Sequence, residues 1–332
     1  MADTRYDVVG IGNAIVDIIG RCDDAFLAKH DLRKGFMRLI DAQQAEEIYA
    51  LMGDGIERSG GSAANTIAGL ASFGARAGFI GRVADDQFGT VFAHDIRAIG
   101  VTYETPPAKN GPPTALCLIF VTPDGERTMN TFLGASTELG PGDVNASLIA
   151  SAQVTYLEGY LFDKPEAKQA FHTAAGLAAK AGRKTALTLS DAFCVDRHRD
   201  DFRKLVRHGV DILFANEKEI TALYEVNRFE EAVAAVRGDC EIAVLTRSER
   251  GSVIVTKRTT IDIAPKPVRK VVDVTGAGDL YAAGFLYGLT RSLSLADCGR
   301  LGSLAAAEVI GHIGARPEQP LMQLARVEGL VR

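Results

Sequence analysis

The chain has 332 residues, which allows one large α/β domain with an appendage or two domains, each able to bury a core. Its net charge of -5 and the absence of a basic stripe argue against nucleic acid as a main partner. Five scattered cysteines, no leader-like N-terminus and no long apolar run predict a reduced, cytoplasmic protein without a membrane partner.

Apolar runs alternate with segments of helical period along most of the chain. Strand-like runs lie at 6–12, 77–83, 154–159, 184–189, 211–215, 242–246, 252–256 and 259–263. Helix-period segments lie at 61–73, 88–99, 165–181, 217–224, 229–237, 275–289 and 295–313. This alternation predicts a largely parallel sheet covered by helices on both faces.

Two regions, 17–41 and 113–133, break this alternation. In the second, apolar runs at 113–121 and 126–132 flank a Pro-Asp-Gly turn, which predicts a β-hairpin. Separated pieces of β-structure of this kind could assemble a small lid over the α/β domain. We therefore expect one domain over 1–332, with a lid subdomain from approximately 14–41 and 106–135.

The segment 273–280, Asp-Val-Thr-Gly-Ala-Gly-Asp-Leu, predicts a glycine-lined turn at the start of a helix. Its backbone N–H groups and the positive end of the helix suit a phosphate. Asp279 would repel a phosphate, so its place there makes sense if it takes the proton from an attacking hydroxyl. The alternative is a plain helix-entry turn in which Asp279 only interacts with the helix dipole. The first interpretation predicts a phosphotransferase.

Two further motifs supply polar groups for a hydroxylated ligand. Residues 60–65, Gly-Gly-Ser-Ala-Ala-Asn, open a helix at which paired glycines admit a ligand and Asn65 can donate and accept hydrogen bonds. Residues 10–17 nearly match GxGxxG, but Ile15 replaces the third glycine and removes most support for dinucleotide binding. Asn13 and Asp17 instead place polar groups where the first strand leaves the sheet.

The motifs at 60–65 and 273–280 together resemble the two signatures of the ribokinase-like (pfkB) carbohydrate and nucleoside kinases. The resemblance covers nearly the whole chain and implies a three-layer α/β/α fold with a mainly parallel central sheet and a small β-sheet lid. It implies transfer of the ATP γ-phosphate to a primary hydroxyl, with Asp279 as general base. The implied anion hole is formed by the amides of Gly276, Ala277 and Gly278. The implied substrate-binding residues are Asn13, Asp17, Gly61, Ser62 and Asn65.

The resemblance also implies sites for the cofactors, ATP and Mg²⁺. Glu219, in an N-x-x-E element that begins at Asn216, would organise Mg²⁺ through water. Asn216, Thr246, Ser248, Gly251, Gly276 and Gly278 would contact the nucleotide, and carbonyls near Asp273, Thr275, Ile310 and Gly314 resemble loops that bind a monovalent cation such as K⁺. Because no GxxxxGK[ST] motif occurs, Arg127 on the lid hairpin is the expected positive partner for the phosphates.

The acceptor is expected to be a nucleoside. The long segment between Asp17 and the glycine pair, and residues 158–162 and 188–193, resemble the adenosine-kinase branch. A purine needs a flat apolar slot, which Phe36, Tyr160 or Phe162 could supply unless they belong to the core. We therefore predict 5'-phosphorylation of adenosine, an activity of purine salvage; a kinase for ribose, fructose or a related free sugar would use the same Asp17, Asn65 and Asp279. The expected state is a monomer or a lid-mediated homodimer.

Overall fold

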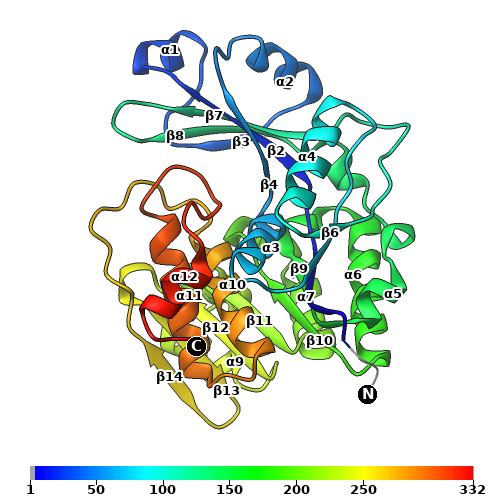
Figure 1. Cartoon of the computed structure of the whole chain (residues 1–332), viewed down its shortest axis with the longest axis vertical. Helices are drawn as coiled ribbons and strands as arrows, with labels where there is room; N and C mark the ends of the chain where they lie inside the picture. The colour runs from blue at the N-terminus through cyan, green and yellow to red at the C-terminus, as the bar shows by residue number, and fades with distance from the viewer. Residues whose placement is uncertain (1–3, 332) are drawn as a thin grey trace.

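The computed structural model describes residues 4–331 and contains two β-sheets of different size. The larger sheet lies at the centre of a helix-covered main domain, and the smaller one forms a lid above it (Figure 1). The ribokinase-like α/β fold expected from the sequence is confirmed. No helix within residues 4–331 is long and apolar enough to cross a membrane.

The main-domain sheet has nine strands. In spatial order they are β14 (Thr260–Ile263), β13 (Ser252–Thr256), β12 (Ile242–Thr246), β11 (Ile212–Asn216), β10 (Lys184–Thr188), β9 (Ala152–Glu158), β1 (Tyr6–Ile11), β5 (Ala77–Ile80) and β6 (Thr102–Tyr103). Pairing is parallel from β12 through to β6, and antiparallel where β13 and β14 extend the edge. The carboxyl ends of the parallel strands therefore share one edge, where ligands bind in open α/β sheets.

Helices cover both faces of this sheet. The helices on one face are α3 (Ser62–Ser72), α4 (Gln87–Ala98), α10 (Ala277–Thr290), α11 (Leu295–Val309) and α12 (Leu321–Val327). The helices on the other face are α5 (Ala146–Ala150), α6 (Pro165–Lys180), α7 (Ala192–Gly209), α8 (Glu217–Tyr224) and α9 (Phe229–Val236). The sequence did not predict α7, because His198 has non-helical dihedral angles and interrupts the apolar period between Val195 and Phe202.

The lid is a five-stranded sheet. Its strands, in spatial order, are β3 (Met37–Leu39), β8 (Arg127–Phe132), β7 (Ala115–Val121), β2 (Ile15–Arg21) and β4 (Ile56–Gly60). Strands β7 and β8 form the antiparallel hairpin expected from the sequence, with a Gly125 N–H to Thr122 O bond of 2.8 Å in its turn. Strand β4 lies outside the ranges expected for the lid, and it ends on Gly60, the first glycine of the pair.

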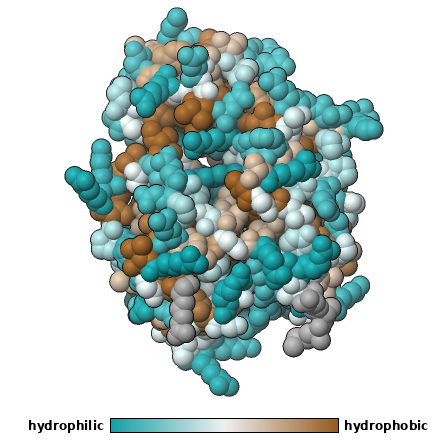
Figure 2. Space-filling model, in the orientation of Figure 1, coloured by the Kyte–Doolittle hydropathy of each residue, from teal (hydrophilic) through white to brown (hydrophobic). Residues whose placement is uncertain are grey.

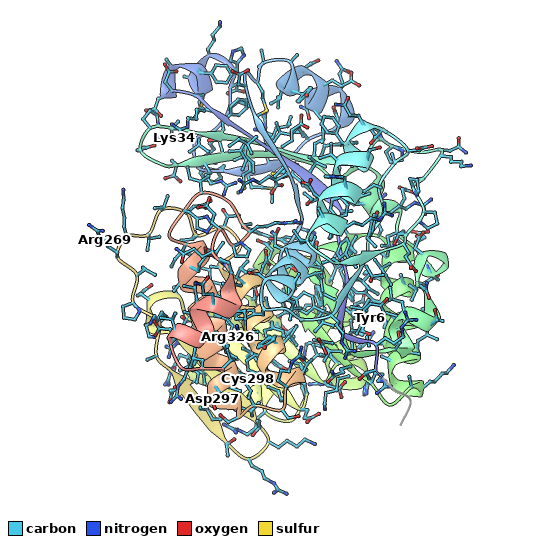
Figure 3. The ribbon with its side chains drawn as sticks, in the orientation of Figure 1. Tyr6, Lys34, Arg269, Asp297, Cys298 and Arg326 are labelled. Carbon is cyan, nitrogen blue, oxygen red and sulfur yellow. The ribbon has the colours of Figure 1, made fainter. Side chains whose placement is uncertain are left out.

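The two faces of the lid sheet differ in what covers them. Side chains such as Ile18 and Phe120 pack beneath α1 (Asp24–Lys29) and α2 (Ala42–Tyr49). At the outer end of the lid, Lys34 donates to Asp24 at 2.7 Å and to Asp124 at 2.6 Å, which fastens α1 to the hairpin turn (Figure 3). The opposite face carries Ile15, Cys117 and Ile119 and packs on Ile313 of the main domain.

Candidate active site

The glycine-rich turn stands at the start of α10. Gly276 has φ of +77°, and a Cβ atom there would lie 2.8 Å from Cα of Ala315, so both the conformation and the space require glycine. Among the described residues, the amides of Gly276, Gly278 and Asp279 donate to no acceptor, whereas Ala277 N–H donates to Val274 O at 3.2 Å. The expected anion hole at 276–278 therefore keeps free amides at Gly276 and Gly278, while that of Ala277 is engaged in the turn.

Asp279 is held by two side chains from the start of α3. Ser62 Oγ donates to Oδ1 of Asp279 at 2.6 Å, and Asn65 Nδ2 donates to Oδ2 at 3.1 Å. Burial raises the pKa of Asp279 to about 6, although both hydrogen bonds favour the charged form. The structure thus joins the two glycine motifs, more than two hundred residues apart in sequence, around a single carboxylate.

Gly61 is required where α3 approaches β1. Its φ is +101°, and a Cβ atom there would lie 2.2 Å from the carbonyl oxygen of Asn13. The glycine therefore brings the start of α3, with Ser62 and Asn65, close to the end of β1.

Asp17 faces the same space from the lid. Burial raises its pKa to about 6; Arg127 and Arg316 oppose this rise, and the charge of Asp279 adds to it. A Cβ atom on Gly60 would lie 2.4 Å from Oδ2 of Asp17, so glycine is needed for the carboxylate to fit. The lid and the main domain therefore each contribute one carboxylate to the space between them.

Sequence reasoning missed Glu158, at the carboxyl end of β9. This carboxylate is buried and accepts from Asn13 Nδ2 at 2.6 Å, Asn13 N at 3.3 Å and Ala63 N at 2.7 Å. Burial raises its pKa to about 7. Asn13 is thus held by Glu158, and only its buried Oδ1 is without a partner in the described residues. A charged residue at the end of a buried strand was the signal that could have found Glu158.

Arg127 lies between the lid and the anion turn. Its guanidinium pairs with Asp273, whose carboxylate also accepts from Thr275 N and Gly314 N, each at 2.9 Å. Arg127 Nε is buried with no partner among the described residues. The Ile310 carbonyl, expected near a monovalent cation, already accepts from Val272 N at 2.8 Å. Asp273 therefore ties together the anion turn, the lid arginine and the loop after α11.

The residues expected near the nucleotide follow β11 and β12. Asn216 and Glu219 form a reciprocal helix cap in which both Glu219 oxygens accept from Asn216, at 2.5 and 2.9 Å. Burial raises the pKa of Glu219 to about 7. Thr246 pairs with Asn216, so both ends lie at the same edge of the sheet.

The loop after Thr246 turns tightly. Ser248 has φ of +52° and Gly251 φ of +79°. A Cβ atom on Gly251 would lie 2.1 Å from the carbonyl oxygen of Ile263, so glycine is required there. Within residues 4–331, no group of three or more His, Cys, Asp or Glu side chains is placed to hold a metal ion.

The aromatic residues expected against a base divide into two kinds. Phe162 is fully buried and stacks on Phe202 with ring centroids 4.2 Å apart, so it belongs to the core, and its predicted contact with substrate is wrong. Tyr160 is 37% exposed, and burial together with the charges of Asp191 and Glu219 raises its pKa. Phe36 is exposed on the lid, with the Arg33 guanidinium 3.4 Å from its ring centroid.

The set of groups at this edge fits a nucleotide phosphate and a hydroxylated acceptor. Free amides at a helix start suit an anion, and the neighbouring carboxylate is placed to receive a proton. The pfkB family carbohydrate kinase profile matches residues 36–321. The chain therefore belongs to the pfkB family and is a kinase whose acceptor is a hydroxyl group.

Three relatives define the neighbourhood of this chain within that family. A probable sugar kinase from Rhizobium etli CFN 42 is 53% identical with a TM-score of 0.92, covering 99% of this chain and 100% of that one. An adenosine kinase from Sinorhizobium meliloti is 54% identical with a TM-score of 0.91, covering 98% and 99%. Adenosine kinase 2 of Arabidopsis thaliana is 26% identical over 362 residues, covering 96% and 99%. These relatives support the kinase assignment and include both nucleoside and sugar kinases.

Proposed function

We propose that the protein transfers the ATP γ-phosphate to the 5'-hydroxyl of a nucleoside, with adenosine as the preferred acceptor. The observation that carries this proposal is a set of exposed apolar side chains on the lid face that carries Asp17. Met37, Leu39 and Ile56 are 47%, 57% and 57% exposed. Figure 2 shows hydrophobic side chains gathered at the lid, next to the opening between lid and main domain.

The strand register places this surface on the face that carries Asp17. Leu39 pairs with Thr131, Thr131 with Cys117, and Cys117 with Asp17, and paired residues point to the same side of a sheet. Ile56 belongs to the same face because it pairs with Ile19, two residues from Asp17. Ile56, on the strand next to that of Asp17, is the nearest of the three, whereas Met37 and Leu39 lie at the opposite edge of the sheet, beyond β7 and β8. A purine on a ribose held by Asp17 can bury apolar surface on this face, which a free sugar cannot.

Two exposed aromatic rings support the same interpretation. Tyr160 follows β9, and Phe193, which the sequence analysis did not select, is 75% exposed and follows β10. Because β9 and β10 are parallel neighbours, both rings stand at the ligand-binding edge of the sheet. The adenosine kinase relative at 54% identity adds weight to a nucleoside acceptor.

In the proposed mechanism, Asp279 accepts the proton of the acceptor hydroxyl as that oxygen attacks. Ser62 and Asn65 fix the carboxylate by their hydrogen bonds at 2.6 and 3.1 Å. The free amides of Gly276 and Gly278 and the Arg127 guanidinium would offset charge on the phosphoryl oxygens. When bound, ATP would supply the γ-phosphoryl group, and Mg²⁺ would offset the negative charge of its phosphates. The lid would exclude water, which favours transfer to the acceptor over hydrolysis.

We extend the proposal to the residues that would contact the nucleotide, Mg²⁺ and K⁺. Both Glu219 oxygens are engaged by Asn216, which supports contact with Mg²⁺ through water. Thr246, Ser248 and Gly251 would line the nucleotide loop, and carbonyls around Asp273, Thr275 and Gly314 would bind K⁺. We further propose action in the cytoplasm, in purine salvage, as a monomer or as a homodimer formed through the lid, whose edge strands β3 and β4 are open to pairing.

The test is ADP release with ATP and Mg²⁺ across adenosine, other nucleosides, ribose and fructose. Adenosine should give the highest kcat/KM. Turnover with a free sugar and none with any nucleoside would replace the proposal with the sugar-kinase alternative, which the same Asp17, Asn65 and Asp279 would serve.

A further inference from the structure

We propose that Arg316 is a positioning residue that controls the catalytic carboxylate of Asp279 through Asn65. The inference rests on the proposed role of Asp279 as general base. Arg316 belongs to no motif that the sequence analysis selected, and it lies in the loop between α11 and α12. Its effect on Asp279 would be indirect, since the contact between them runs through one amide side chain.

The hydrogen bonds form a chain of three residues. Arg316 Nε donates to Asn65 Oδ1 at 3.4 Å, and Asn65 Nδ2 donates to Asp279 Oδ2 at 3.1 Å. An arginine can only donate, so it holds the amide oxygen of Asn65 toward itself. The amide nitrogen must then face Asp279. Without Arg316, Asn65 could turn its oxygen toward protonated Asp279 and accept the carboxyl O–H, which would favour the neutral acid.

The loop that carries Arg316 is fastened to the anion turn. Gly314 N donates to Asp273 Oδ2 at 2.9 Å, and Ala315 packs where Gly276 lacks a side chain. Asp273 also accepts from Thr275 N at 2.9 Å. Arg316 therefore keeps a fixed position relative to Asp279, which is what a positioning residue needs.

The guanidinium of Arg316 is partly buried among charged groups, and one of its nitrogens has no hydrogen-bond partner among the described residues. Burial lowers its pKa to about 10, while Asp17 on β2 and Asp95 on α4 favour its charge and Arg58 on β4 opposes it. Asp95 is itself occupied, accepting from Ser59 N at 3.1 Å. Arg316 Nη2 is buried with no partner among the described residues. We therefore interpret the hydrogen bond from Arg316 to Asn65 as the functional contact of this guanidinium.

The groups that face Asp279 set the background for a pH test. Ser62 and Asn65 contact it from α3, and its charge acts on Asp17 of β2, Glu158 of β9 and Glu219 of α8. Asp17, Glu158 and Glu219 can titrate in the same range as Asp279, so a kinetic profile alone reports several groups. Direct titration of Asp279 by carbon NMR, with ¹³C-labelled aspartate and Asp279→Asn for assignment, separates them.

The experiment compares Arg316→Met and Arg316→Lys with the wild type. Arg316→Met, which has no donor to offer Asn65, should raise the pKa of Asp279 by about one pH unit, both in the NMR titration and in the acid limb of kcat. Arg316→Lys, which keeps a donor and a charge, should restore most of the shift. Arg237→Met is the matched control, because Arg237 makes structural bonds to Thr256, Thr259 and Thr260 far from the site; it should leave both readouts unchanged.

A double-mutant cycle tests whether the effect passes through Asn65. Asn65→Ala should raise the pKa of Asp279 by itself, and Arg316→Met should add little in that background. Additive shifts, or an unchanged pKa in Arg316→Met, would overturn the proposal. If Asp279→Asn keeps full turnover, the general-base role fails, whereas the NMR titration still reports whether Arg316 controls that carboxylate.

Discussion

The two sheets of this kinase bury their faces in different ways. The nine-stranded sheet has helices on both faces, whereas the lid sheet is covered by α1 and α2 on one face only. The other face of the lid carries Asp17 and exposed Leu39 and packs on Ile313 of the main domain, which holds Asp279 on a fixed helix start. We infer a division of labour, in which the main domain performs the phosphoryl transfer and the lid selects the acceptor.

The largest expected effect separates chemistry from binding. Asp279→Asn should fold and bind both substrates, but it should turn over at least about a hundredfold more slowly with every acceptor, because no base receives the proton. Single-turnover rates with a separate measurement of substrate affinity check this. Turnover within a few-fold of the wild type would remove Asp279 from the base role.

The second largest effect should be on acceptor affinity, which we assign to the lid, and not on ATP affinity. Asp17→Ala should weaken acceptor affinity by about tenfold or more, since a charged hydrogen-bond acceptor for the sugar hydroxyls is lost. The KM for ATP serves as the internal control and should change little. Equal losses for both substrates would show that Asp17 does not belong to the acceptor site.

The pH dependence sharpens the role of the main-domain carboxylate. Burial raises the pKa of Asp279 to about 6, so the active, charged form is lost as the pH falls below that value. The kcat at saturating substrates should therefore drop about tenfold between pH 7 and pH 5. A kcat that stays level down to pH 5 would contradict the assigned pKa or the role of Asp279.

The smallest effect concerns the apolar surface of the lid. Ile56→Ala should raise the KM for adenosine about five- to tenfold, because the purine would bury less apolar surface, and should leave activity toward ribose unchanged. Val327→Ala, at a 77% exposed position on α12 away from the lid, is the control. An equal effect on both acceptors would mean that Ile56 does not contact the base.

The sequence predicted the main domain better than the lid, for physical reasons. Buried parallel strands are continuous apolar runs, and glycine at 276 is imposed by a positive φ, so both are visible locally. The lid strand β2 finds its partner β7 far away in the chain, pairing Ile15 with Ala115, and Arg316 is linked to Asn65 across 251 residues. Phe162 was predicted to contact the substrate but lies in the core, because the sequence pattern around a buried aromatic residue is the same in the core as in a binding site.

The central claim is that this site phosphorylates a nucleoside rather than a free sugar, and a competition experiment tests it most directly. Adenosine and ribose would be supplied together at equal concentration with limiting ATP and Mg²⁺, and the phosphorylated products identified by ³¹P NMR. The account predicts AMP as the dominant product. Ribose phosphate as the dominant product would contradict it.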